Sequence, residues 1–398
     1  MTDTIPVDDV DLFSDEARID PYPIYERLRE AGPVVRLTRQ DLYALTRYAD
    51  VRAALMDWPT FSSAKGVFVD PGVNASLEGI TLCSDPPEHT MLRSVLGRPL
   101  RPELSREMAP RIEAAADHIV GELVGRGRFD AATELAEHLP MTVVSDLVGL
   151  GEGHRGKMLE WAAAIWDVQG PANERFTAAM PLVEEFLGFA AEEAVPGKIV
   201  PDGWADQLYQ AADRGELPRD KCPALMLDYV TPSLDTTILA TTSAIALFAQ
   251  HPEQWHRLRE DRSLIPHAVN ECLRIESPVP QFSRVLTEDH TIDGVALPAG
   301  SRVALLYGAA NRDPRKYPDP DRFDITRRPS DQLAFGRGEH VCIGMNLARL
   351  EMGTLLDRLA DVVERFEVVS SRPLLNNGLR GLESLEVIVH RSPAPASS

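Results

Sequence analysis

The stretch Phe335-Gly336-Arg337-Gly338-Glu339-His340-Val341-Cys342-Ile343-Gly344 decides the interpretation of this chain. A cysteine follows a loop with two glycines, and apolar residues recur after it at helical spacing from Leu347 to Leu359. Cys342 is therefore expected near a helix N-terminus, where unpaired backbone N–H groups favour negative charge. Such a setting lowers the pKa of a thiol and favours the thiolate.

The residues alone leave three uses of Cys342 open. It can be a nucleophile, a ligand of a metal or haem iron, or an inert buried thiol, and the last is the commonest state of a free cysteine. The other cysteines, Cys83, Cys222 and Cys272, are scattered without metal-ligand spacing. This pattern suggests free thiols in a reducing cytoplasm.

Composition narrows the class of protein. The chain has 398 residues, 44% of them hydrophobic, and a formal net charge of −20. So acidic a surface argues against nucleic acid and anionic membranes as partners. No stretch approaches the ~20 apolar residues of a membrane span. Residues 1–20 are polar and acidic, so we expect a flexible N-terminal segment, followed by a single domain over residues 21–398.

Local patterns predict several elements. The runs 34–37 and 42–46 predict the two strands of a hairpin, and His290–Ile292 and Val295–Leu297, on either side of Asp293-Gly294, predict two further strands. Residues 61–82 predict a long irregular loop. Its apolar side chains Phe68, Val69, Ile80 and Leu82 either face a ligand or anchor the loop to the core.

The opening stretch resembles the haem-thiolate loop of the cytochrome P450 family, Phe-x-x-Gly-x-x-x-Cys-x-Gly, and further landmarks follow the family order from about Asp20 to His390. The resemblance implies a fold that is mainly α with a smaller β region, the cytochrome P450 fold. It also implies haem b, with Cys342 as the axial iron ligand. Phe335, Gly336 and Gly344 would shape the haem site around the sulfur.

Four basic side chains match the family positions that bind the haem propionates. They are His89 and Arg93, four residues apart at the start of a predicted helix, Arg284 in a predicted strand, and His340, two residues before the cysteine. The simpler interpretation of His89 and Arg93 is a surface ion-pairing face.

A proline interrupts a long apolar helix expected from about Cys222 to Gln250. Pro232 cannot donate to the carbonyl of Asp228, so the helix should bend there. Asp235 and Thr236 follow directly and resemble the acid and alcohol of the family motif Ala-Gly-x-Asp/Glu-Thr, which handles O2 and its protons. Pro232 and Ser233 replace the Ala-Gly pair, which is a departure from the family.

Glu271 and Arg274 match the structural Glu-x-x-Arg element of the family. On its own such a pair is commonly surface decoration. In the family it meets a further arginine from a Pro-rich segment, and Arg322 is expected to fill that place.

The resemblance also suggests a compact, mostly apolar substrate pocket. Its expected lining is Phe68, Val69, Trp166, Asp228, Thr231, Pro232, Pro280, Phe282 and Leu379. Parts of the chain look like aromatic-acid O-demethylases, but Leu227 and Asp228 stand where an Arg-Ser carboxylate anchor would be. A buried acid repels a carboxylate substrate, which favours a neutral small molecule; alternatively Asp228 turns away from the pocket.

The resemblance implies a monooxygenase that acts on a small-molecule substrate by hydroxylation or O-dealkylation. Electrons would come from NAD(P)H through a [2Fe–2S] ferredoxin and its reductase, and we expect a cytoplasmic monomer. The basic residues Arg98, Arg101, Arg106 and Arg337 are the docking candidates, by charge complementarity. Two alternatives stay open: a natural-product tailoring hydroxylase of terpenes or polyketides, and a haem-thiolate sensor or binding protein without turnover.

Overall fold

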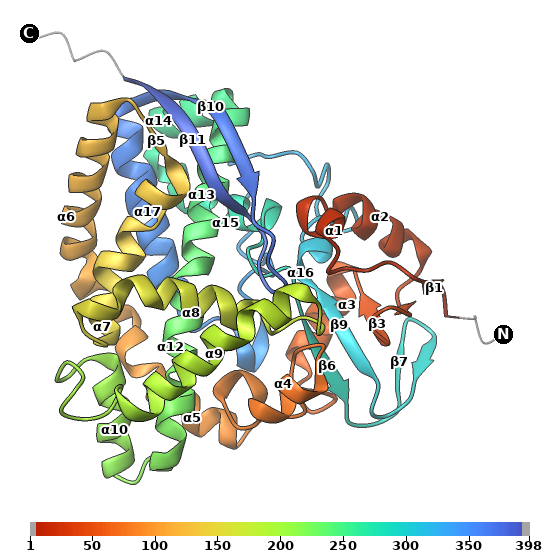
Figure 1. The fold of residues 1–398 in the computed structure, drawn as a ribbon. Helices are drawn as coiled ribbons and strands as arrows, with labels where there is room; N and C mark the ends of the chain where they lie inside the picture. The colour runs from red at the N-terminus through yellow and green to blue at the C-terminus, as the bar shows by residue number, and fades with distance from the viewer. Residues whose placement is uncertain (1–4, 392–398) are drawn as a thin grey trace, which may run out of the picture.

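The computed structural model describes residues 5–391, with the side chains of residues 105, 152 and 155 left aside (Figure 1). The α-helices are α1 (Asp15–Ile19), α2 (Tyr22–Ala31), α3 (Tyr48–Met56), α4 (Pro71–Ser76), α5 (Glu88–Leu96), α6 (Pro102–Arg126), α7 (Ser145–Val148), α8 (Arg155–Asp167), α9 (Glu174–Glu192), α10 (Trp204–Asp213), α11 (Cys222–Leu225), α12 (Leu227–Ser233), α13 (Asp235–Gln250), α14 (Pro252–Glu260), α15 (Ile265–Ile275), α16 (Tyr307–Ala310) and α17 (Met345–Val362). The strands are β1 (Val7–Asp8), β2 (Val35–Leu37), β3 (Leu42–Leu45), β4 (Phe61–Ser62), β5 (Arg128–Asp130), β6 (Gln281–Leu286), β7 (His290–Ile292), β8 (Val295–Leu297), β9 (Arg302–Leu306), β10 (Val363–Pro373) and β11 (Leu382–Arg391).

Most of the helices gather on one side of the molecule and the largest sheet lies on the other (Figure 1). That sheet has the strand order β1-β2-β3-β9-β6-β4. The predicted hairpin of residues 34–37 and 42–46 is confirmed as β2 and β3, which pair antiparallel. The long β10–β11 hairpin, joined by β5, runs from the helical side toward the boundary with the sheet (Figure 1). The predominantly helical fold with a smaller β region is confirmed.

Helices α13 and α17 lie at the centre of the helical part. Every residue of α13 from Thr237 to Phe248 is buried, as expected for a helix that is apolar all round. Helix α17 buries one stripe, which includes Leu347, Leu355 and Leu359. Both helices contribute to one large apolar core. Asp235, the first residue of α13, and Cys342, three residues before α17, are therefore held on a rigid base.

The N-terminal segment differs from its prediction as a flexible tail. Strand β1 pairs in parallel with β2, and Leu12 and Phe13 are buried against the sheet. The side chain of Arg18 is also buried and donates to the carbonyl oxygen of Leu379. The burial of Leu12 and Phe13 therefore holds the segment against the sheet despite its acidic composition. Residues 1–4 lie outside the described residues.

The proline-containing helix is broken rather than gently bent. It divides into α11, α12 and α13, and the break between the last two falls at Leu234, with φ −103° and ψ −78°, two residues after Pro232. The long loop expected over residues 61–82 contains β4, α4 and a 3-10 turn, Thr81–Cys83. No helix within residues 5–391 is long and apolar enough to cross a membrane.

Candidate active site

One cavity lies between the broken helix α12–α13 and the loop that carries Cys342. Its empty volume is about 1540 Å³, which includes the mouth that opens to solvent. Both Thr236 and Cys342 contribute to its wall. Many other wall residues are apolar, among them Leu82, Leu96 and Val279. An apolar cavity with a few polar groups is the usual form of a small-molecule or cofactor site.

The Cys342 loop is built by its glycines and by one backbone hydrogen bond. Gly336 and Gly338 take φ of 66° and 68°, a region that glycine enters without strain. A side chain at Gly338 would also collide with the carbonyl oxygen of Leu55. The N–H of Cys342 donates to the carbonyl of Phe335 at 2.8 Å, which closes the loop and directs the thiol to the cavity wall.

The pKa of Cys342 differs from the sequence expectation. Burial raises the pKa of the thiol, while a hydrogen bond from the Gly344 backbone and the positive charge of Arg93 act in the opposite direction. The protein groups alone therefore do not hold this cysteine as a thiolate, because burial outweighs the N–H groups of the helix N-terminus.

Four basic side chains lie near this cysteine: His89, Arg93, Arg284 and His340. The rings of His89 and His340 lie 4.2 Å apart between centroids. Burial, and next the positive charges of Arg284, His89 and Arg93, lower the pKa of His340 to about 2. Burial also lowers the pKa of His89. Both ring nitrogens of His89 and Nε2 of His340 are buried without a hydrogen-bond partner among the described residues.

This cluster of donors fits a haem. A buried polar group without a partner is costly, and no carboxylate of residues 5–391 hydrogen-bonds the two histidine rings. Two carboxylates, such as the propionates of haem b, would satisfy these nitrogens. The cluster lies beside a thiol that reaches the same cavity, which is the donor set that a haem iron needs.

The opposite wall of the cavity contains Thr236. Its hydroxyl donates to the carbonyl of Pro232 at 2.8 Å, and Ser233 donates to the carbonyl of Tyr229. Side-chain hydroxyls therefore satisfy carbonyls near the break in the helix. Pro232 itself is exposed to the cavity.

Asp235 lies beside Thr236 in the sequence but does not contribute to the cavity wall. Its Oδ2 is buried and has no hydrogen-bond partner among the described residues. Burial, and next the charge of Glu137, raise the pKa of Asp235 to about 8. Burial also raises the pKa of Glu137, to about 7. Asp235 can therefore hold a proton near neutral pH.

The predicted substrate residues divide into three groups. Trp166, Asp228, Pro232 and Phe282 line the cavity, whereas Phe68 and Val69 line a smaller pocket that shares Phe282 with it. Three residues line neither pocket: Thr231, Pro280 and Leu379.

Each of these three has a structural position that explains the error. The Thr231 carbonyl accepts a hydrogen bond from Trp166 Nε1 at 3.2 Å. The Pro280 carbonyl accepts one from Gly308 at 3.1 Å. Leu379 is buried against Trp166 and Leu239.

Sequence reasoning missed several wall residues. Thr81 lines the cavity beside Leu82, which was a candidate, whereas Thr81 was not. Val279 lies two residues before β6, and Tyr307 is the first residue of α16, directly after β9. The apolar pattern of residues 61–82 marked the segment as a candidate, but it carries no period that tells which side chain faces the cavity.

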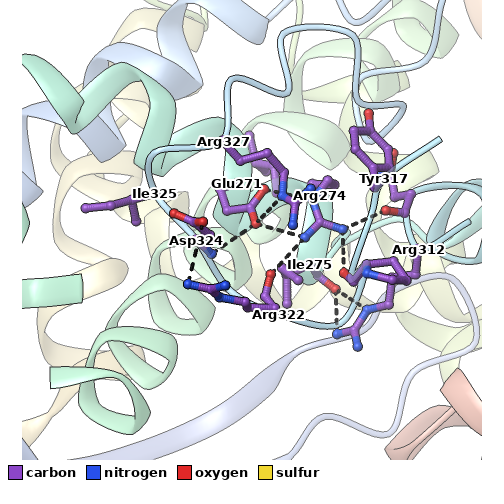
Figure 2. A network of polar contacts seen from close by, with 12 residues as sticks. Glu271, Arg274, Ile275, Arg312, Tyr317, Arg322, Asp324, Ile325 and Arg327 are labelled. Atoms are coloured by element: carbon purple, nitrogen blue, oxygen red, sulfur yellow. Dashed lines mark hydrogen bonds and ion pairs between the residues drawn. The ribbon is translucent and has the colours of Figure 1, made fainter. Parts of the chain in front are cut away.

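The Glu271–Arg274 pair is fully buried, with N–O distances of 2.7 and 2.8 Å. The prediction that Arg322 joins this pair is wrong. Its side chain is 65% exposed and lies 4.0 Å from Asp324, and only its backbone carbonyl accepts from Arg274. Figure 2 shows that Arg327 meets Glu271 instead, at 3.3 Å.

The reason is the direction of the chain after Arg322. Backbone carbonyls of Asn311 and Pro320 accept from the Arg274 guanidinium at 2.8 and 2.7 Å. The Asp324 N–H donates to Glu271 at 3.2 Å. The segment thus meets the buried pair with its backbone, and the Arg322 side chain points to solvent.

The four candidate docking residues occupy different surroundings. Arg98 pairs with Glu216, and Arg106 is exposed with a Glu103 partner at 3.6 Å. Arg101 is exposed and directly precedes α6. Arg337 is half-buried and donates to the Ser330 carbonyl at 2.9 Å. A Cβ atom at Gly97 would lie 3.2 Å from Ile343, so the Arg98 turn adjoins the cysteine loop.

Comparison with known proteins agrees with this architecture. A family model described as cytochrome P450 matches residues 203–377. Cytochrome P450 CYP199A2 of Rhodopseudomonas palustris is 37% identical over 383 residues, which cover 95% of this chain and 93% of that protein. The 6-deoxyerythronolide B hydroxylase of Saccharopolyspora erythraea is 33% identical over 405 residues, with 95% and 98% covered.

Solved structures give the same result. CalO2 matches with a TM-score of 0.83 and 27% identity, covering 96% of this chain and 98% of that one. The myxobacterial CYP267B1, solved with myristic acid, matches with a TM-score of 0.83 and 30% identity, covering 95% and 98%.

The fold and its relatives define the class of haem-dependent oxygenases. The chain belongs to the cytochrome P450 family and is a cytochrome P450 monooxygenase. The family implies a haem iron, O2 and reducing electrons delivered by redox partner proteins.

Proposed function

We propose that this monooxygenase inserts one oxygen atom of O2 into a C–H bond of a small, mostly apolar organic substrate. The observation that carries the proposal is that Cys342 and Thr236 line a single cavity whose remaining wall is largely apolar. Hydroxylation and O-dealkylation of an aromatic ether begin with the same insertion. In O-dealkylation the attacked carbon is the one attached to the ether oxygen.

The cofactor of this proposal is haem b, which supplies the activation of O2 when bound. Cys342 would bind the iron through its sulfur, and Phe335 would shield that sulfur from water. Gly336 and Gly344 keep the loop and the start of α17 close to the sulfur.

The propionates are held by His89, Arg93, Arg284 and His340. The support for this assignment is the set of buried ring nitrogens that no other described residue satisfies. Charge-assisted hydrogen bonds to carboxylates are among the stronger ones in proteins.

On the other side of the cavity, Thr236 offers a hydroxyl and Asp235 a proton. The hydroxyl is held by the Pro232 carbonyl, which fixes the direction of its oxygen toward the cavity. Asp235, with a pKa raised to about 8, would replace protons that the reaction consumes, provided that water links it to the cavity.

Electrons would come from NAD(P)H through a [2Fe–2S] ferredoxin and its reductase. The surface around Arg98, Arg101, Arg106 and Arg337 is the proposed docking site for the ferredoxin, because it adjoins the cysteine loop in a protein that is otherwise strongly acidic. Complementary charge mainly accelerates such encounters. A single haem-thiolate domain, a monomeric state and a cytoplasmic location stay predictions.

A tailoring hydroxylase for a larger natural product is the second candidate. It is supported by the relationship to an enzyme named 6-deoxyerythronolide B hydroxylase and by a cavity that extends as far as Leu100 and Trp204. A spectral-shift screen with small aromatic ethers and with macrolide or terpene scaffolds separates the two, since only the true class will bind tightly and be converted.

The test of the proposed function compares the protein with a Cys342→Ser variant. The reduced carbon-monoxide complex should show the band specific for a thiolate ligand, and the variant should lose it. Product formation with NADH, a surrogate ferredoxin and its reductase should accompany the band. A band that survives in the variant refutes the ligand assignment, and a band without any turnover favours a sensor.

A further inference from the structure

A single carboxylate stands out on the wall of the cavity. Asp228, on α12, is the only aspartate of the described wall residues, and Glu351, the other acidic residue there, lies on α17. The sequence left open whether Asp228 turns away from the cavity, and the structure answers that it does not.

The position of this carboxylate is fixed from one side. Its Oδ2 accepts a hydrogen bond from the N–H of Thr81 at 3.1 Å. That bond ties α12 to the 3-10 turn Thr81–Cys83. The carboxylate is therefore a built part of the wall rather than a mobile surface group.

This carboxylate forms no ion pair with a cation among the described residues, and Leu82, Trp166 and Phe282 provide apolar walls of the same cavity. Burial raises the pKa of Asp228 to about 6, against the hydrogen bonds from Thr81. A carboxylate kept in an apolar cavity without a cation is costly unless a ligand supplies the missing partner.

We propose that Asp228 is the substrate anchor of this enzyme and that it binds a protonated amine on a small aromatic substrate. The inference rests on the proposed function, because it assigns the substrate class of the same cavity. It replaces the earlier preference for a neutral molecule with a preference for a cationic one, and it likewise disfavours aromatic acids.

The geometry of the helix also limits the length of the substrate. Asp228, Pro232 and Thr236 follow one another at intervals of four residues and all reach the cavity. In an unbroken helix, eight residues at about 1.5 Å each span roughly 12 Å, and the break at Leu234 falls within this interval. A benzene ring with the donor at one end and the reacting carbon in the para position has about the right length to bridge that interval.

The experiment uses the haem-loaded enzyme and three ligands of equal shape. They are 4-methoxybenzylamine, 4-methoxybenzyl alcohol and 4-methoxybenzoate, titrated at about pH 7.5, where the amine is protonated. The readout is the dissociation constant from the low-spin to high-spin spectral shift. We expect the amine to bind at least about tenfold more tightly than the alcohol, and the benzoate to bind most weakly of the three.

An Asp228→Asn variant removes the charge and keeps the shape. It should lose the preference for the amine over the alcohol, whereas Asp293→Asn, an exposed carboxylate on the β7–β8 turn, should keep it. If Asp228→Asn fails to load haem, Asp228→Ser provides the same comparison with a smaller side chain.

Several outcomes overturn the proposal. One is an amine preference that stays unchanged in both Asp228 variants. Another is the absence of any amine preference in the parent enzyme. The third is a spectrum typical of an amine nitrogen bound to iron, which would mean that the amine points toward the haem and not toward Asp228. Each leaves the proposed function standing if the thiolate band and turnover of other substrates remain. Loss of the thiolate band in the parent enzyme contradicts the proposed function instead.

Discussion

The hydroxyl of Thr236 donates a hydrogen bond to the carbonyl oxygen of Pro232, 2.8 Å away and one turn earlier. This bond crosses the helix break at Leu234. It satisfies a carbonyl near the interruption and leaves the hydroxyl oxygen free to accept a hydrogen bond from the cavity side. Thr236 is therefore oriented before any ligand arrives.

Removal of this hydroxyl should uncouple electron use from product. We expect a Thr236→Ala variant to keep the haem spectrum and to consume NAD(P)H with less product per electron pair, because the cavity wall then lacks the oriented hydroxyl that would direct protons. The measurement is the ratio of product to NAD(P)H consumed, with peroxide assayed in parallel. Thr236→Ser, which retains the hydroxyl, is the matched control, and equal coupling in all three proteins would refute the role.

Local sequence signals predicted the elements whose cause is local. The strands His290–Ile292 and Val295–Leu297 were predicted with the bounds that the structure shows, because Asp293-Gly294 between them is a strong hairpin turn. The sequence predicts a bend of the helix at Pro232, and the structure has the break two residues later. The Ser233 and Thr236 hydroxyls donate to nearby backbone carbonyls, and an argument from the backbone alone does not include such hydrogen bonds.

Relations between distant segments were harder to predict. The approach of His89 to His340 followed only from the family resemblance, because nothing in either local sequence specifies the other. Arg327 was missed for the same reason. Arg322 and Arg327 both follow the Pro-rich segment, and only the path of the backbone past Glu271 decides which side chain turns inward.

The correction from Arg322 to Arg327 leads to a stability prediction. Arg327→Ala should lower the free energy of unfolding by about 1–3 kcal/mol, because the buried Glu271 carboxylate loses a charged neighbour. Arg322→Ala should cost less than about 1 kcal/mol, since its side chain is exposed. Chemical denaturation of both variants, monitored by the haem band and by circular dichroism, gives the comparison. The reverse order would restore Arg322 to the role first expected.

The raised pKa of Asp235 makes stability depend on pH. Unfolded, this carboxyl titrates near 3.8, and folded near 8. The folded state thus holds the proton more tightly, so the stabilising contribution is fully present below about pH 4 and is lost as the pH rises to about 8. An Asp235→Asn variant, which cannot ionise, should gain thermal stability over the parent as the pH rises through this range.

The same variant should lose activity if Asp235 transfers protons. We expect its turnover to fall by roughly 10²-fold and its solvent isotope effect to rise, with Asp235→Glu recovering part of the rate. Burial raises the pKa of Glu137 to about 7, so this carboxyl also titrates near neutral pH. It is present in the parent and in both Asp235 variants, so its titration contributes to all three activities that are compared. A stable variant with full turnover would assign Asp235 a structural role only.

The docking surface is best tested at Arg106. Its side chain is 76% exposed and its pairing with Glu103 is long, at 3.6 Å, so a reversal of charge disturbs little else, whereas Arg98 is engaged with Glu216. Arg106→Glu should raise the KM for a [2Fe–2S] ferredoxin severalfold and weaken its dependence on salt. The control is Arg372→Glu, on the β10–β11 hairpin, where the arginine side chain is similarly exposed, at 68%. Both variants change the net charge by the same amount. Reduction by dithionite, which needs no protein partner, should be the same in all three proteins. An equal rise in the KM for ferredoxin in the two variants would mean that the overall charge of the protein, and not this surface, governs the encounter.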